Sequence, residues 1–313
     1  MNPWFLAALF FGSILASAVV VGLSIRYAEN IGYVDAPDGE RKQQVRPIPK
    51  SGGLAVALVF TIAALVTLLF MGPSSHRDDA VSILLAALFA AALGFADDRQ
   101  PLSPGIRLAA QAAIAALIWV GGSRITVTHV YWLDFALTVV WVLAIVNGLN
   151  LLDNSDGLAG STAAVTSGAA TIIAILAGQY WIAPFGAAVC GVSLGFLLHN
   201  WFPARVYLGD AGAYFLGVLL AVLVIRLQPS EVNDLVGVLV AVSLVALPLL
   251  DTSFVVVRRL RRGVHPFTAG RDHLSHEVQN RGASIPLSVA LLQLISIGGA
   301  VVAVLLVLLG HRT

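Results

Sequence analysis

The sequence predicts an all-α, polytopic integral membrane protein with about ten transmembrane helices. Of its 313 residues, 58% are hydrophobic and only 11% are charged. Soluble domains are about 45–50% apolar, so this composition excludes an ordinary soluble domain. The mean hydropathy of +0.88 reflects recurring apolar runs of about 18 or more residues, the length that lets a helix cross a bilayer. We expect residues 1–313 to form a single transmembrane domain.

In chain order, the apolar runs predict ten spans. The third, fourth and fifth runs are short for full crossings, and the first lacks a basic n-region and a small-residue cleavage site, so we expect it to be retained. The lone cysteine, Cys190, lies inside a run and is interpreted as a small buried side chain. The spans are Trp4–Ile25, Gly52–Met71, Ala80–Ala96, Ile106–Val120, Leu133–Leu149, Leu158–Ala177, Trp181–Leu198, Ala211–Leu227, Leu235–Val257 and Ile285–Leu309.

The basic residues divide unequally between the two sides that ten spans create. Four of the 18 Lys and Arg residues fall on the side that also holds both termini, namely Arg77, Arg124, Arg226 and Arg312. The rest fall on the other side, which the positive-inside rule assigns to the cytoplasm. Every cluster of carboxylates, amides and histidines lies on this same side. We therefore expect one cytoplasm-facing site in the cell membrane, with both termini outside.

The most informative stretch is Asn147–Ser161, which reads NGLNLLDNSDGLAGS between two apolar runs. Polar groups beside hydrocarbon are costly, so such a cluster indicates function. Asn147 and Asn150 are three apart, as on one helical face, and Asp156 is placed to cap the next helix. A broken backbone with free amides and oxygen ligands suits a hard cation together with a phosphate. The alternative is a polar turn between two spans.

Two further acidic motifs fall on the same side. Asp97 and Asp98 close the third span, where paired carboxylates can supply a general base or a metal ligand; interfacial capping is an equal alternative. Asp210, in LGDAG, opens the eighth span. An N-cap role is common for such an aspartate, yet beside the other clusters Asp210 becomes a further oxygen ligand.

The basic loops complete the set. Residues 258–262 contain four arginines, which are most simply anchors for anionic lipid. Further along, Arg271, His273 and His276 bring donors together at a density that fits a diphosphate. No cysteine or HExxH pattern favours zinc. Lys50 lies in a proline-stiffened basic loop, where a generic loop and a substrate contact are equally favoured.

Five motifs in this order resemble the polyprenyl-phosphate N-acetylhexosamine-1-phosphate transferases. They are the RPIPKSGG loop, Asp97-Asp98-Arg99, the NGLNLLDNSDG stretch, LGDAG and RDHLSH. Two departures stand out. Asn154 replaces a glycine that the family often has, and only His273 and His276 are present where the phospho-MurNAc-pentapeptide branch has consecutive histidines. The resemblance therefore favours the bacterial undecaprenyl-phosphate GlcNAc-1-phosphate transferase branch.

The resemblance implies transfer of a sugar 1-phosphate, expected to be GlcNAc 1-phosphate, from a UDP-N-acetylhexosamine to undecaprenyl phosphate. UMP would be released in this first membrane step of envelope glycan synthesis, with a catalytic core at about residues 80–285. It also implies Mg²⁺, with Mn²⁺ as a substitute, no nucleic-acid partner, and compatibility with a homodimer. The implied site has metal ligands Asn150 and Asp210, catalytic residues Asp97, Asp98, Asp153 and Asp156, and substrate-binding residues Lys50, Asn147, Arg271, His273 and His276.

A transporter or lipid flippase with an acidic ion relay is the alternative. Transporters place ionisable groups near the bilayer midplane, often in two repeated halves. Here the acids gather at span ends on one side, and no repeat is evident. Asp251, inside the ninth run, has no role that the sequence defines.

Overall fold

The computed structural model describes residues 2–37, 46–71, 76–227, 234–265, 268 and 270–310. Most of these residues are helical. The elements are α1 (Pro3–Asn30), β1 (Val34–Asp35), β2 (Ile48–Pro49), α2 (Gly52–Met71), α3 (Arg77–Arg99), α4 (Pro104–Val120), α5 (Tyr131–Leu152), α6 (Leu158–Leu176), α7 (Ala183–Asn200), α8 (Gly209–Arg226), α9 (Asp234–Leu244), α10 (Ala246–Arg261), α11 (Leu274–Asn280) and α12 (Ile285–Gly310). Three basic residues of the charge division lie outside the described residues, namely Arg312 and, on the expected cytoplasmic side, Arg41 and Lys42.

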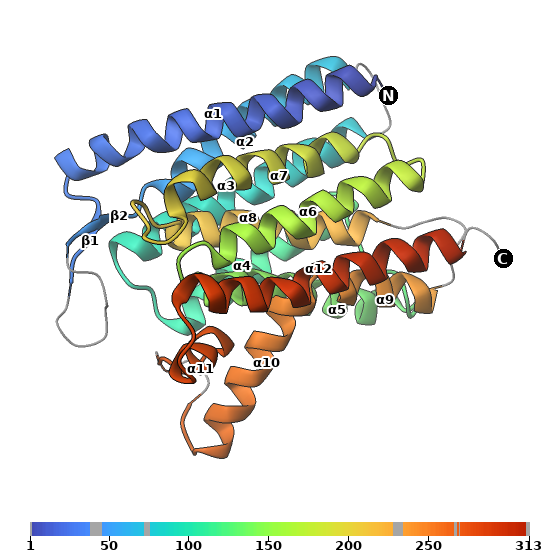
Figure 1. Cartoon of the computed structure of the whole chain (residues 1–313). Coiled ribbons are helices and arrows are strands. Elements are labelled where there is room, and N and C mark those ends of the chain that lie inside the picture. Colours follow the sequence, from blue (N-terminus) through green and yellow to red (C-terminus); the bar gives the residue numbers. More distant parts are fainter. Residues whose placement is uncertain are drawn as a thin grey trace.

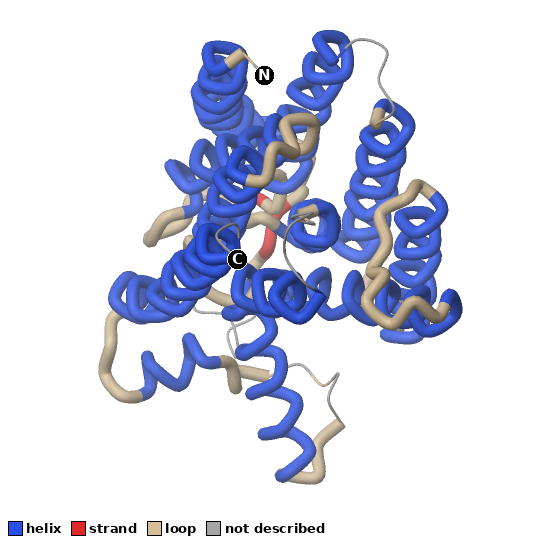
Figure 2. The backbone as a smooth tube through the Cα atoms, turned by 90° about the vertical axis from the view of Figure 1, so that its right-hand side faces the viewer, coloured by secondary structure: helices blue, strands red, loops and turns tan. Residues whose placement is uncertain are grey.

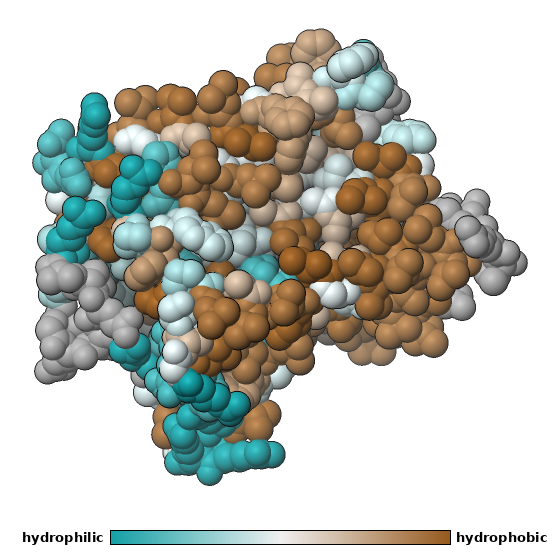
Figure 3. All heavy atoms as spheres, viewed as in Figure 1, coloured by the Kyte–Doolittle hydropathy of each residue, from teal (hydrophilic) through white to brown (hydrophobic). Residues whose placement is uncertain are grey.

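The prediction of an all-α polytopic membrane protein is confirmed. Eight helices in the described ranges are long and apolar enough to cross a membrane, α4 is a shorter apolar helix, and α9 with α10 forms a broken pair. The long helices run side by side, and Figure 2 looks along them. Hydrophobic side chains cover the flank of the bundle, whereas hydrophilic ones gather at the end that carries β1 and β2 (Figure 3). Helix α1 begins and α12 ends at the opposite end (Figure 1).

The expectation of one continuous ninth span over Leu235–Val257 is wrong. The helix breaks at Val245, and α9 and α10 meet at an angle of 74°. Pro248 explains the break, because its ring would clash with the carbonyl four residues earlier, that of Leu244. The Leu244 carbonyl instead accepts a hydrogen bond of 2.9 Å from the Thr166 hydroxyl. Helix α10 consequently leaves the bundle (Figure 1).

Helix α8 forms the centre of the bundle. Its residues from Ala211 to Ile225 are buried on every side, as expected for a helix that is apolar all round. It packs against α2, α3 and α5. The first turn of α8 is therefore held at the polar end of the bundle, surrounded by the ends of other helices.

The short antiparallel pair of β1 and β2 fixes the first polar loop against this end. Val34 pairs with Pro49 in register, and the Lys50 amide donates to the Tyr33 carbonyl at 3.2 Å. On the other side of the strand, the Tyr207 amide donates to the Pro49 carbonyl at 2.8 Å. The Lys50 side chain thus extends from a backbone segment that is hydrogen-bonded on both sides.

Candidate active site

A cavity of about 800 Å³ lies at the polar end of the bundle. Its wall combines side chains from both basic loops with the acidic ends of α3, α5 and α8. Seven of the predicted site residues line it, namely Lys50, Asp98, Asp153, Asp156, Asp210, Arg271 and His276. The cavity therefore gathers motifs that are up to 226 positions apart in the chain (Lys50 to His276).

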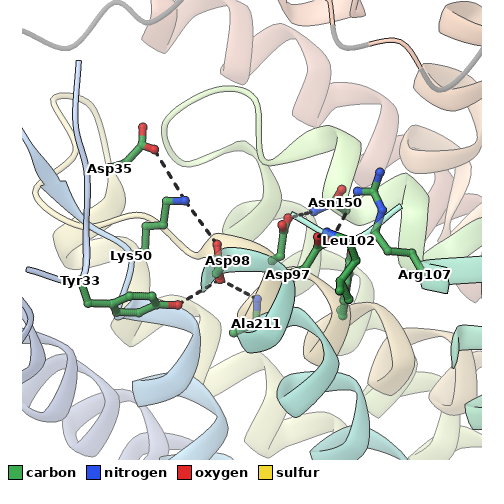
Figure 4. Close-up of polar contacts among 11 residues, drawn as sticks. Tyr33, Asp35, Lys50, Asp97, Asp98, Leu102, Arg107, Asn150 and Ala211 are labelled. Carbon is green, nitrogen blue, oxygen red and sulfur yellow. Dashed lines mark hydrogen bonds and ion pairs between the residues drawn. The ribbon is translucent and has the colours of Figure 1, made fainter. Parts of the chain in front are cut away.

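Asp98 faces this cavity, and its carboxylate makes three contacts (Figure 4). It accepts hydrogen bonds from the Tyr33 hydroxyl at 3.1 Å and from the Ala211 amide at 3.1 Å. The Lys50 ammonium lies 3.6 Å from it. Asp98 is thus placed between a lysine ammonium and the amino end of α8, where partial positive charge favours an anion.

Asp97 points the other way and is not among the cavity-lining residues (Figure 4). Its carboxylate accepts from the Leu102 amide at 2.7 Å and from the Tyr214 hydroxyl at 2.7 Å. The Arg107 guanidinium lies 3.4 Å away. The sequence does not distinguish the two adjacent aspartates, but the structure does: Asp98 lines the cavity, whereas Asp97 is bound by groups outside the cavity wall.

The close approach of α3 and α8 depends on two glycines. A side chain at Gly94 would overlap the backbone of Asp210 and Ala211. Gly209 has a φ of +69°, a left-handed conformation that glycine adopts without strain, and a side chain there would meet the Asp98 carboxylate. These positions bring the end of α3 against the beginning of α8.

Asp210 lies in the first turn of α8 and is not its N-cap, which is Leu208. Its Oδ1 accepts a hydrogen bond of 2.6 Å from Asn150 Nδ2. The structure therefore joins the two predicted metal ligands, from α5 and α8, although Asn150 is not among the cavity-lining residues. Asp153, at the C-cap of α5, is near enough to Asp210 and Asp98 to interact electrostatically with both carboxylates.

Asn147 does not share this arrangement, although it is three residues from Asn150. Its amide donates to Gln111 Oε1 at 2.6 Å and to the Leu143 carbonyl at 2.8 Å. It is not among the lining residues. The structure therefore places the Asn147 amide against Gln111 of α4.

The expected capping role of Asp156 is also wrong. Helix α6 has Gly157 as its N-cap, without a side-chain cap. Asp156 instead accepts from the Ala204 amide at 2.9 Å, while Asn200 Oδ1 accepts from the Gly157 amide at 3.0 Å. Asp156 thereby connects the acidic loop to the segment that precedes α8.

Helix α10 holds the second basic loop through two buried side chains, a role that the sequence did not predict for either of them. The fully buried Asp251 accepts from His273 Nδ1 at 2.8 Å and from the Leu274 amide at 2.8 Å. Two turns later, Arg259 binds Asp272 in a bidentate pair at 2.8 and 2.7 Å. Asp251 and Arg259 are eight residues apart, so they lie near one face of α10. A buried charged pair at this helical spacing is the sequence signal that could have indicated their role. The expectation that residue 259 is a lipid anchor is wrong for this reason.

Helix α11 in turn fastens the basic loop to the acidic loop. The Ser275 hydroxyl donates to Asn154 Oδ1 at 2.5 Å, and Asn154 Nδ2 donates to the Leu151 carbonyl at 2.5 Å. Gln279 Nε2 lies 3.4 Å from Ser155 Oγ. Asn154, the departure from the family pattern, thus connects two walls of the cavity.

The titratable groups outside the spans follow from this packing. Burial, and then the charges of Asp210 and Asp98, raise the pKa of the Asp153 carboxyl well above its usual range. Burial also raises the pKa of Asp156. Burial, and then the neighbouring His273 and Arg271, lower the pKa of His276 to about 4. His276 is therefore neutral near pH 7, and its Nδ1 is buried without a hydrogen-bond partner among the described residues.

This apolar bundle with a charged cavity at its end is a multi-pass membrane protein with a site for a polar ligand. The family model for glycosyl transferase family 4 matches residues 80–228. A Streptomyces coelicolor protein named as a putative glycosyltransferase is 32% identical over 308 residues, 96% of this chain and 68% of that protein. The chain belongs to glycosyl transferase family 4.

Two other relatives carry more specific names. A Bacillus subtilis protein named as a probable undecaprenyl-phosphate N-acetylglucosaminyl 1-phosphate transferase is 27% identical over 306 residues, 95% of this chain and 84% of that protein. The undecaprenyl-phosphate alpha-N-acetylglucosaminyl 1-phosphate transferase of Yersinia pestis is 28% identical over 307 residues, 91% of this chain and 82% of that protein. The family that the sequence motifs resemble is thereby confirmed.

Proposed function

We propose that this protein transfers GlcNAc 1-phosphate from UDP-N-acetylglucosamine to undecaprenyl phosphate and releases UMP. The product is an undecaprenyl-diphosphate sugar, the first lipid-linked intermediate of an envelope glycan. The observation that carries this proposal is the cavity in which seven motif residues meet at the polar end of an apolar bundle. Names of relatives that act on the same kind of acceptor support it.

The reaction is a phosphoryl transfer, so it rests on positioning and on neutralising charge. An acceptor phosphate oxygen attacks the β-phosphorus of the donor, and the bond from that phosphorus to the bridging oxygen breaks. Asp98 orients the acceptor phosphate and takes its proton, since it is the aspartate of the pair that faces the cavity. Lys50, which is 3.6 Å from Asp98 and from Asp35, balances the charge of the acceptor. Asp97 holds the end of α3 through Arg107 and Tyr214.

The donor set fits Mg²⁺, which prefers few carboxylates together with substrate phosphate oxygens. Asp210 and Asn150 would hold the ion, with Asp153 beside them. No group of three His, Cys, Asp or Glu side chains in the described ranges could hold a metal ion alone, so the proposed ion would need substrate oxygens and water to complete its ligands. When bound, Mg²⁺ neutralises diphosphate charge. Mn²⁺ would substitute because it accepts the same oxygen ligands.

The remaining wall suits the donor. Arg271 supplies a guanidinium for a diphosphate oxygen, and the neutral His276 supplies a hydrogen-bonding ring nitrogen. His273 is turned into the protein by Asp251, so it positions the loop. The polar end would face the cytoplasm, with both termini outside. Carboxylates at helix ends around one cavity support this reaction over an ion relay, which needs ionisable groups at the midplane.

Purified protein would be incubated with undecaprenyl phosphate, Mg²⁺ and a panel of UDP-sugars while UMP release is measured. We expect release that needs both substrates, that is highest with UDP-N-acetylglucosamine, and that is lost with EDTA or in Asp210→Ala. A higher rate with another UDP-sugar would change the assigned donor. No UMP with any donor, from a sample with a normal thermal transition, would overturn the proposal.

A further inference from the structure

A second cavity, of about 550 Å³, lies on the outer side of β2 between α1 and the end of α7. The first cavity accounts for the reacting groups, so this one needs a separate explanation. Arg46 and Ile48 line both cavities, and β2 therefore forms a wall between them. We call this second cavity the α1 groove.

Guanidinium groups dominate the polar part of the α1 groove. Arg26, Arg46 and Arg205 line it, against Glu29 as its acidic side chain. Arg26 and Arg46 are exposed and make no ion pair with the described residues. This charge balance fits an anion with several acceptor oxygens, above all a phosphate.

Arg205 is held in place by a short hydrogen-bond chain. Its Nη2 donates to the Leu198 carbonyl at 3.0 Å and to His199 Nδ1 at 2.9 Å. His199 must then carry its proton on Nε2, which donates to the Ala18 carbonyl of α1 at 2.8 Å. The guanidinium is thus oriented at the groove before any ligand arrives, and its Nε and Nη1 groups donate to none of the described residues.

The rest of the groove is apolar and follows α1 into the membrane. Ala18, Val19 and Leu23 line it, and the side chains of Val19 and Leu23 are 53% and 60% exposed. From Arg26 back to Ala18, eight helical residues cover about 12 Å at a rise of about 1.5 Å each. A phosphate site continued by an apolar channel of this depth matches a lipid headgroup with one acyl chain.

We infer that the α1 groove binds an anionic phospholipid, with its phosphate on Arg26, Arg46 and Arg205 and one chain along α1. A phospholipid is favoured over the reacting acceptor because Glu29 is the one carboxylate among the described residues that line the groove, too few to hold a metal ion and a general base. The lipid phosphate on Arg46 also fixes β2, from which Lys50 extends into the first cavity. The membrane lipid thereby steadies the cation that pairs with Asp98.

The test is the affinity for phosphatidylglycerol, measured by native mass spectrometry of protein released from phosphatidylcholine nanodiscs. The groove variant is Arg26→Gln with Arg46→Gln. The matched control is Arg261→Gln with Arg262→Gln, which removes the same charge from exposed positions at the end of α10. Each basic residue near an anionic lipid contributes about fivefold in affinity, so we expect the groove variant to bind about 25-fold more weakly and the control to retain the tightest site.

A second variant, Val19→Trp, fills the apolar channel without changing any charge, and it too should lose the tightest phosphatidylglycerol. An equal loss in the control, or no loss in either groove variant, would overturn the assignment. So would displacement of that phosphatidylglycerol by undecaprenyl phosphate, which would make the acceptor the occupant. This test measures lipid binding, so a negative result would not count against the proposed reaction. In the same way, a negative result in the UMP assay would not count against the lipid site.

Discussion

Replacement of each of the two adjacent aspartates by asparagine tests the division of roles between them. Asp98→Asn removes a carboxylate that faces the cavity and lies 3.6 Å from Lys50. Loss of a general base costs about 10²–10⁴-fold in rate, so we expect kcat to fall by about that factor. The protein keeps its fold because the amide oxygen of the substituted side chain can still accept from Tyr33 or from the Ala211 amide.

Asp97→Asn should lower stability and have little effect on kcat. The carboxylate accepts from Leu102 at 2.7 Å and from Tyr214 at 2.7 Å, so the new NH₂ group must face one of these donors. An unsatisfied buried donor costs about 1–3 kcal/mol, and Arg107 loses its counter-charge at 3.4 Å. We discount the ion pair because Arg107 is partly exposed. The variant should unfold at a lower temperature while kcat falls less than about tenfold.

Both variants would be compared by UMP release at saturating substrates and by thermal unfolding in detergent. Asp134→Asn serves as a control, since Asp134 is a buried aspartate at the other end of α5 whose partner is Thr128. The reasoning is refuted if Asp97→Asn abolishes turnover at an unchanged unfolding temperature while Asp98→Asn keeps normal turnover.

Three further predictions concern the loops around the cavity. Asn154→Ala and Ser275→Ala should each weaken donor binding, and their double-mutant cycle should show about 1 kcal/mol of coupling in stability, because they share one hydrogen bond. Arg259→Gln should destabilise the fold by about 1–3 kcal/mol, since it leaves the partly exposed Asp272 carboxylate without its bidentate partner, whereas the exposed Arg261→Gln should change stability by less than about 0.5 kcal/mol. His276 has a pKa lowered to about 4, so the unfolded chain binds its proton first as the pH falls below about 6.5. Wild-type stability should therefore drop by up to about 3 kcal/mol more than that of His276→Gln between pH 7 and pH 4, as followed by thermal unfolding.

The fold was largely predictable because long apolar runs have few structural solutions in a membrane. The ten predicted runs correspond to the helices of the bundle. The exception was the ninth, where hydropathy alone could not weigh Pro248 against a continuous apolar run. Thr166, from a distant helix, supplies the hydrogen bond that makes the break tolerable, and such long-range compensation has no local sequence signal.

The site was predictable as a set of motifs, but its internal arrangement was not. Spacing placed Asn147 and Asn150 on one face, yet neighbouring helices decide which partner each amide finds. Likewise, adjacent positions on α3 point Asp97 and Asp98 in different directions, and only the packing of α4 and α8 shows which one meets the cavity. Asp251 and Arg259 gained their roles from a loop that folds back onto α10.

The most direct measurement uses UDP-N-acetylglucosamine that carries ³²P in its β-phosphate. After incubation with undecaprenyl phosphate and Mg²⁺, the label is partitioned between the organic and the aqueous phase. Transfer of a sugar 1-phosphate carries the β-phosphate with it, so the account predicts label in the lipid and unlabelled UMP in water. Label that stays in water as UDP, with only the sugar moving to the lipid, would contradict the account.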